Sequence, residues 1–138
     1  MKKIIIVFIL LLAVTNCNCG RKLYNFRPDQ SNIQAIQIVS LGDPLKGVEH
    51  NQTVICEIQD ISEFLLDFYE MACYENHIPT SAKFSPVIKI IYKNGDYILI
   101  DYQGQSEFRD GSFWTYEGRF YFEKEQFQAL IQKYMPTE

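Results

Sequence analysis

The sequence predicts an α+β fold, in which a mostly antiparallel sheet of about five to six strands carries two helices packed on one face. Three observations predict it. Short apolar segments alternate with a period of two, as strands do, and two other segments have helical spacing. Asn-Gly and similar pairs separate the strands as in hairpins. The expected order of elements is β-β-α-β-β-β-β-α, which favours helices segregated on one side of a sheet.

Residues 1–16 are expected to form a signal peptide. Lys2 and Lys3 supply a positive start, and Ile4 to Val14 follow as eleven apolar residues without a charge. This pattern is typical of a secretory leader. As a helix the apolar stretch would be about 16 Å long, whereas the hydrocarbon core of a bilayer is roughly 30 Å thick. We therefore expect export rather than a transmembrane anchor.

The segment that follows the leader, Val14-Thr15-Asn16-Cys17, resembles the lipobox of bacterial lipoproteins, in which the Cys is lipidated. With its polar tether and small strand-rich domain, the chain resembles small uncharacterised lipoproteins of low-GC bacteria. The resemblance implies a lipid on Cys17 and a protein anchored to the cell membrane. Ordinary cleavage near Gly20, with release of a soluble protein, is the alternative. Residues 17–32 are then a polar tether, and residues 33–138 a single domain.

Charge limits the classes of partner. Without Lys2 and Lys3 the chain has 11 Lys and Arg against 17 Asp and Glu, a net charge of −6. Non-specific nucleic-acid binding requires a basic surface that displaces counterions, so it is excluded. The order of elements is also similar to that of TBP-like folds, but an acidic chain gives no reason to carry over DNA binding.

Two strands and a helix open the domain. Residues 31–41 and 53–58 are the expected strands. Asp60, followed three residues later by Glu63, has the spacing of a helix-capping box. Apolar residues then recur at helical intervals, which predicts an amphipathic helix from residue 61 to about 74.

The clearest local signal is a hairpin over residues 88–100, because Asn94-Gly95 separates two alternating apolar segments. A two-residue type I′ turn would place Tyr92 opposite Tyr97 and Ile90 opposite Leu99. Residues 113–122 predict a second hairpin around Glu117-Gly118. Finally, Phe127 and the apolar positions three, four and seven residues later predict a terminal helix that Pro136 ends.

Two cysteines, Cys56 and Cys73, lie within the domain. If Cys56 is on a strand and Cys73 on the following helix, their axial separation is about 11 Å. A disulfide requires Cα atoms about 4.4 to 6.8 Å apart, so two separate buried thiols are expected.

The second hairpin supplies the candidate binding face. Its expected register places Trp114 opposite Tyr121 and Tyr116 opposite Arg119, so that these four side chains share the face that two helices cannot cover. Trp, Tyr and Arg are enriched at binding hot spots. The predicted partner is a protein or a glycan; cover by the N-terminal segment is the alternative.

An acidic stripe is expected on the outer side of the first helix, where Glu63, Asp67 and Glu70 lie together with Tyr74. It is either a docking surface for a basic partner or an ordinary solvated face.

An enzymatic function finds little support. The two histidines, His50 and His77, have no metal-ligand spacing, and no nucleophile elbow, phosphate loop or C-x-x-C pair is present. No catalytic residue, metal or cofactor is therefore assigned. The sequence favours a non-enzymatic binding or inhibitory module displayed at the cell surface. The alternatives are a structural accessory of an envelope complex and a small hydrolase with an unrecognised site.

Overall fold

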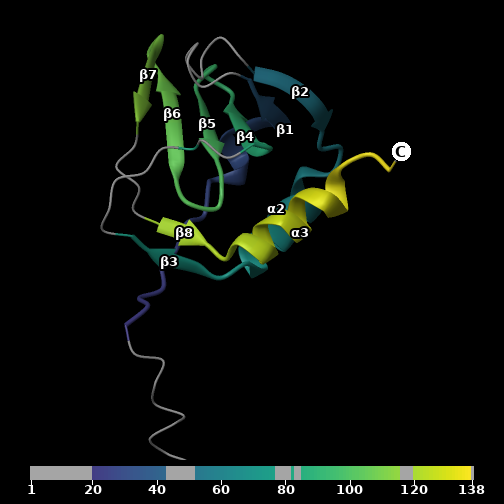
Figure 1. Cartoon of the computed structure of the whole chain (residues 1–138). Coiled ribbons are helices and arrows are strands. Elements are labelled where there is room, and N and C mark those ends of the chain that lie inside the picture. Colours follow the sequence, from purple (N-terminus) through teal and green to yellow (C-terminus); the bar gives the residue numbers. More distant parts are fainter. Residues whose placement is uncertain (1–19, 43–51, 77–81, 83–84, 116–119, 138) are drawn as a thin grey trace, which may run out of the picture.

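The computed structural model describes residues 20–42, 52–76, 82, 85–115 and 120–137, with the side chains of 113–115 left out. These residues form a mixed α+β fold (Figure 1). The elements are a 3-10 turn η1 (Gln30–Asn32), β1 (Ile33–Leu41), β2 (Gln52–Glu57), α2 (Ile61–Glu70), β3 (Cys73–Glu75), β4 (Val87–Tyr92), β5 (Tyr97–Ile100), β6 (Gln105–Arg109), β7 (Ser112–Thr115), β8 (Phe120–Phe122) and α3 (Lys124–Tyr134).

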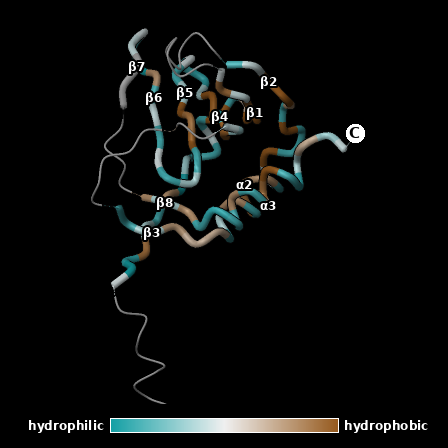
Figure 2. Tube along the Cα trace, in the orientation of Figure 1, coloured by the Kyte–Doolittle hydropathy of each residue, from teal (hydrophilic) through white to brown (hydrophobic). Residues whose placement is uncertain are grey.

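Within this part of the chain, six strands form one antiparallel sheet in the order β2-β1-β4-β5-β6-β7. Both helices pack on one face of it, as expected. Ile36, Ile88 and Ile98 on the strands are buried in the same core cluster as Phe64 of α2 and Phe127 of α3. Figure 2 shows the hydrophobic stretches concentrated in the central strands and along the helices.

The first hairpin forms, but its predicted register is wrong by one residue. Ile90 pairs with Ile98 rather than with Leu99, because the turn has three residues instead of two. Gly95 has φ of +91°, and its N–H donates to the carbonyl of Tyr92, as in a hairpin closed by a glycine bulge. The shift moves Leu99 to the face opposite the helices, where it packs with Val39, Val87 and Ala82.

The second predicted hairpin does not form. β7 instead pairs with β6 across the two-residue turn Asp110-Gly111, in which both residues have positive φ. This combination is typical of a type I′ turn. The sequence interpretation missed β6 because Gln105–Arg109 is mostly polar. β8 pairs with β3 in a separate two-stranded sheet.

The first helix is shorter than predicted. Asp60 caps it as expected, since its carboxylate accepts from the N–H of Glu63 at 2.9 Å. The helix ends at Glu70, and Cys73 lies on β3 opposite Phe122 rather than on a last helical turn. Pairing with β8 therefore overrides the helical periodicity of this segment.

Both thiols are free, in agreement with the sequence, although the geometry differs from the one assumed. Cys56 is half-buried and Cys73 is buried. Burial raises the pKa of Cys73 to about 12 and also raises that of Cys56.

The packed part of the chain starts ahead of the predicted boundary at Ile33. The backbone of Tyr24 donates to Cys73, and the backbone of Lys22 accepts from Glu75. Pro28 is buried, and its carbonyl accepts from the hydroxyl of Tyr69 at 2.9 Å. Much of the stretch expected to be a tether therefore lies against β3 and α2.

Candidate functional site

The predicted aromatic face is not assembled as the sequence suggested. Trp114 lies on β7 opposite Glu107, whereas Tyr121 lies on β8 opposite Tyr74. The prediction that Trp114 opposes Tyr121 is therefore wrong, because their strands belong to different sheets. Tyr116 and Arg119, like Cys17 and both histidines, fall outside the described residues, so their predicted roles stay predictions.

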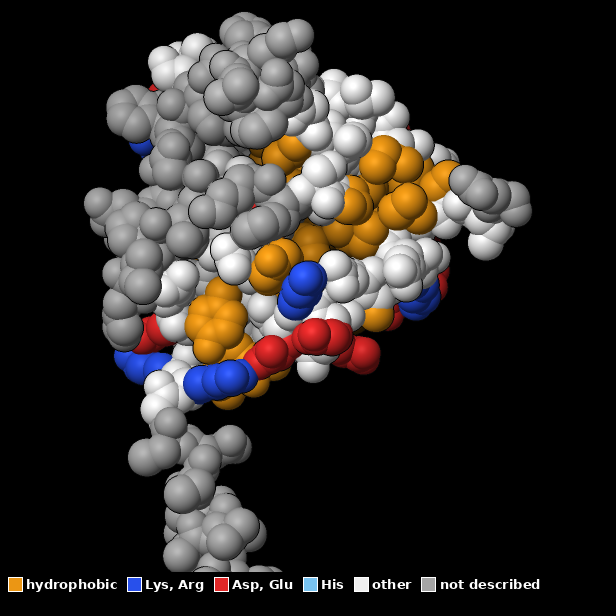
Figure 3. All heavy atoms as spheres, in the orientation of Figure 1, with side chains coloured by type: hydrophobic (Ala, Val, Ile, Leu, Met, Phe, Trp, Pro, Cys, Tyr) orange, Lys and Arg blue, Asp and Glu red, His pale blue; other side chains and the backbone are white. Residues whose placement is uncertain are grey.

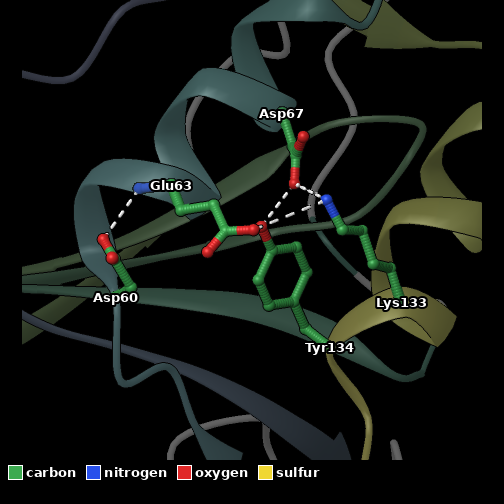
Figure 4. Close-up of polar contacts among 5 residues, drawn as sticks. All are labelled: Asp60, Glu63, Asp67, Lys133 and Tyr134. Carbon is green, nitrogen blue, oxygen red and sulfur yellow. Dashed lines mark hydrogen bonds and ion pairs between the residues drawn. The ribbon is translucent and has the colours of Figure 1, made fainter.

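The acidic stripe on α2 does not form one open surface. Asp67 faces α3, where one of its carboxylate oxygens accepts from the Lys133 ammonium at 2.6 Å and from the Tyr134 hydroxyl. Glu63 lies 3.9 Å from the same ammonium (Figure 4). Tyr74 is on β3, away from the helix. We call the contact of Asp67 with Lys133 and Tyr134 the helix clamp.

The three groups of the helix clamp stabilise one another's ionisation states at neutral pH. The hydrogen bonds from Lys133 and then from Tyr134 lower the pKa of Asp67. Asp67 in turn raises the pKa of Lys133, and burial together with Asp67 raises that of Tyr134. At neutral pH the carboxylate is charged and both of its donors are protonated. The clamp thus joins α2 to α3 through a charged hydrogen-bonded contact.

The opposite side of α3 is hollowed. A cavity of about 540 Å³ lies between α3, the start of β4 and the turn between β5 and β6. We call it the α3 groove, and its apolar lining consists of Pro86, Tyr102, Phe127, Ile131 and Met135. Figure 3 shows hydrophobic side chains in a diagonal band that runs from near the C-terminus, interrupted by a Lys or Arg side chain.

Polar groups form the margin of the α3 groove. Gln128 and Gln132, one helical turn apart, are exposed and line it. Lys124 lies 5.8 Å from the centre of the Tyr102 ring, and among the described residues no carboxylate pairs with its ammonium. A second hollow of about 370 Å³ shares Lys124 and Tyr102 with the groove and continues it towards Tyr121.

The lining of the α3 groove determines what it can do. The described residues that line it include no Cys, His or carboxylate, and the ionisable groups among them are the Lys124 ammonium and the Tyr102 phenol. In the described part of the chain, no three His, Cys, Asp or Glu side chains gather closely enough to hold a metal. The arrangement suits the binding of an apolar group between amide and ammonium donors.

Known proteins provide no guide. The chain matches no protein-family model, and no curated protein or solved structure is significantly similar to it. Among the described residues, no helix has the length and apolar character needed to cross a membrane.

The sequence pointed to one part of the α3 groove. The spacing of Phe127 and Ile131 predicted a helix with an apolar side. Pro86 and Tyr102 carried no signal, because they reach the groove from turns about 40 and 25 residues before the helix. Only the packing of those turns against α3 brings the lining together.

Proposed function

We propose that this protein is a non-enzymatic binding module, held at the cell surface by a lipid on Cys17, and that its α3 groove takes an apolar segment of a partner protein. The observation that carries the proposal is the groove itself. Its volume of about 540 Å³ falls in the range of roughly 300 to 1,000 Å³ that is usual for ligand sites.

The chemistry of the margin favours a polypeptide as the occupant. A side-chain amide both donates and accepts, so Gln128 and Gln132 can pair with the N–H and C=O groups of an extended segment. Met135 at the end of the groove is a flexible apolar residue that adapts to the shape of its partner. Lys124 favours a segment with a carboxylate beside its apolar side chain.

Site-specific photo-crosslinking on the producing cells tests the groove. A benzophenone amino acid at position 128 should give a discrete protein adduct, and the same amino acid at the exposed position 125 should not. Gln132→Trp, which fills the margin of the groove, should reduce the adduct at 128 at least tenfold. Equal adducts at 125 and 128 would refute the groove as the site. An adduct whose added mass is removed by periodate oxidation would reassign the partner as a glycan.

The anchor is tested separately. Cells that are fed an alkyne-bearing palmitate should label the wild-type chain, and Cys17→Ser should abolish the label and move the protein into the medium. Cys19→Ser is the matched control, and it should keep both label and location. An unlabelled wild-type chain in the medium would instead show that the chain is secreted.

A further inference from the structure

The N-terminal segment, β3 and β8 together form a narrow ribbon. Leu23 bridges Tyr74 on β3, and Tyr74 pairs with Tyr121 on β8. Residues directly opposite each other in antiparallel strands point to the same side, so these three side chains form one row. The rings of Tyr74 and Tyr121 are 5.4 Å apart, and the guanidinium of Arg21 lies 5.5 Å from the centre of the Tyr74 ring. We call this row, with Arg21, the outer ribbon face.

The other side of the ribbon belongs to the core. Phe120 and Phe122 are buried, and Tyr24 and Phe26 both stack on Phe120. In contrast, Leu23 is 70% exposed, one of the few large apolar side chains in the described part of the chain that are open to solvent. The ribbon thus has an inner side packed in the core and an outer side on which Leu23 is open to solvent and Tyr74 and Tyr121 are half-buried.

The charges beside the outer ribbon face are balanced. Arg21 pairs with Glu123, and Lys22 pairs with Glu75 at 3.0 Å. The face therefore attracts neither a strongly acidic nor a strongly basic partner. A row of one Leu and two Tyr side chains suits the boundary between lipid and water, where Tyr rings are enriched.

The short stretch of chain between Cys17 and the outer ribbon face favours the membrane as the surface that this face contacts. Arg21 is four positions after Cys17 in the sequence, and a fully extended chain over those four steps reaches about 14 Å. A lipid on Cys17 would hold the start of the ribbon within that distance of the membrane. Because residues 22–24 are hydrogen-bonded to β3, no long tether remains to let the domain turn away.

We infer that the outer ribbon face lies on the membrane to which the chain is anchored, with Leu23 and Tyr121 at the level of the lipid headgroups. This inference rests on the anchoring part of the proposed function. It also fixes the orientation of the sheet. The N–H of Phe122 donates to the carbonyl of Tyr102, so the β5–β6 turn is at the membrane end and the Asp110-Gly111 turn at the opposite end (Figure 1).

Depth-dependent quenching tests the orientation. The full lipidated chain, with a fluorescent amino acid at position 25 or at position 112, is reconstituted in phosphatidylcholine–phosphatidylglycerol vesicles that contain lipids spin-labelled near the headgroup. The probe at 25 should be quenched at least threefold more strongly than the probe at 112, which lies beside the Asp110-Gly111 turn. Equal quenching of a protein that floats with the vesicles would overturn the inference and leave the anchor intact. A protein that does not float would overturn both.

A pair of matched substitutions separates contact from mere proximity. Leu23→Asp places a charge in the outer ribbon face, and Val54→Asp makes the same change at another exposed aliphatic position, on β2. Both sites are open to solvent, so the fold should persist in each variant. Leu23→Asp should reduce the quenching at position 25 at least twofold, and Val54→Asp should leave it unchanged. Unchanged quenching in both variants would show that this face does not touch the lipid.

Discussion

Helix α3 has a closed side, which meets α2 through the helix clamp, and an open side, which lines the α3 groove. On the closed side, Asp67 and Lys133 each stabilise the charge of the other. On the open side, Met135 and Tyr102 are half-covered, and Lys124 lies near an aromatic ring but forms no ion pair with a carboxylate among the described residues. A paired surface stabilises the fold, whereas an incomplete one can gain free energy by binding.

The largest effect on stability is expected at Phe127, the residue of α3 that the core and the α3 groove share. Phe127 is 2% exposed, belongs to the main core and also lines the α3 groove. Phe127→Ala should lower the free energy of unfolding by about 3–5 kcal/mol, because it removes buried surface and leaves a cavity. Urea unfolding monitored by circular dichroism measures this loss. A change below about 1 kcal/mol would mean that α3 is packed more loosely than described.

A smaller effect is expected on the closed side. Asp67→Asn keeps the size of the side chain but removes the charge that holds Lys133 and Tyr134. The thermal midpoint at neutral pH should fall by a few degrees. Glu125→Gln, which removes an exposed charge from the same helix, is the control and should have little effect. Equal shifts in the two variants would show that the helix clamp contributes only net charge.

The same clamp predicts a pH dependence. The folded pKa of Asp67 is lowered, so its stabilising effect is complete above the unfolded value of about 3.9 and is lost as the pH falls through the folded pKa. The folded pKa of Lys133 is raised, so its effect is complete below about 10.4 and is lost as the pH rises through the folded value. The midpoint difference between wild type and Asp67→Asn should therefore shrink below about pH 4. A constant difference down to pH 2 would contradict this.

The smallest effect on stability is expected on the open side. Gln132→Trp adds bulk at an exposed position, so the free energy of unfolding should change by no more than about 0.5 kcal/mol. Glu125→Trp makes a comparable addition away from the groove and should be equally neutral. Urea unfolding compares the two, and only Gln132→Trp should reduce crosslinking from position 128. Loss of stability in Gln132→Trp alone would show that the groove is part of the core.

Local sequence signals predicted the helix cap and both helices, but not the register of the first hairpin. The cap at Asp60 and the periodicity of Phe64 and Phe127 are local, and both appear in the structure. Asn94-Gly95 also marked the correct turn, but the same pair suits a two-residue turn and a three-residue turn with a glycine bulge. The sequence therefore located the hairpin without fixing its register.

The candidate site was harder to predict because it depends on distant contacts. Trp114 and Tyr121 are seven residues apart, and a local hairpin between them was the simplest interpretation. In the structure, the strand of Trp114 (β7) pairs with β6, and the strand of Tyr121 (β8) pairs with β3. Neither β6 nor β3 has a strong apolar pattern that would have predicted these pairings. The sequence analysis placed Asp67 on the outer side of α2 because the packing of α3 against that side is a distant contact that the sequence did not show.

The two free thiols of the domain bear on how long the protein survives at the cell surface. If the chain is exported as we propose, it meets oxidising surroundings, in which the fold buries Cys73 and half-buries Cys56. Each transient opening exposes them to oxidants and to the other cysteines of the chain, and a mispaired disulfide formed then would block refolding. The working life of the molecule is then a matter of kinetic stability, set by how rarely the domain opens rather than by its equilibrium free energy.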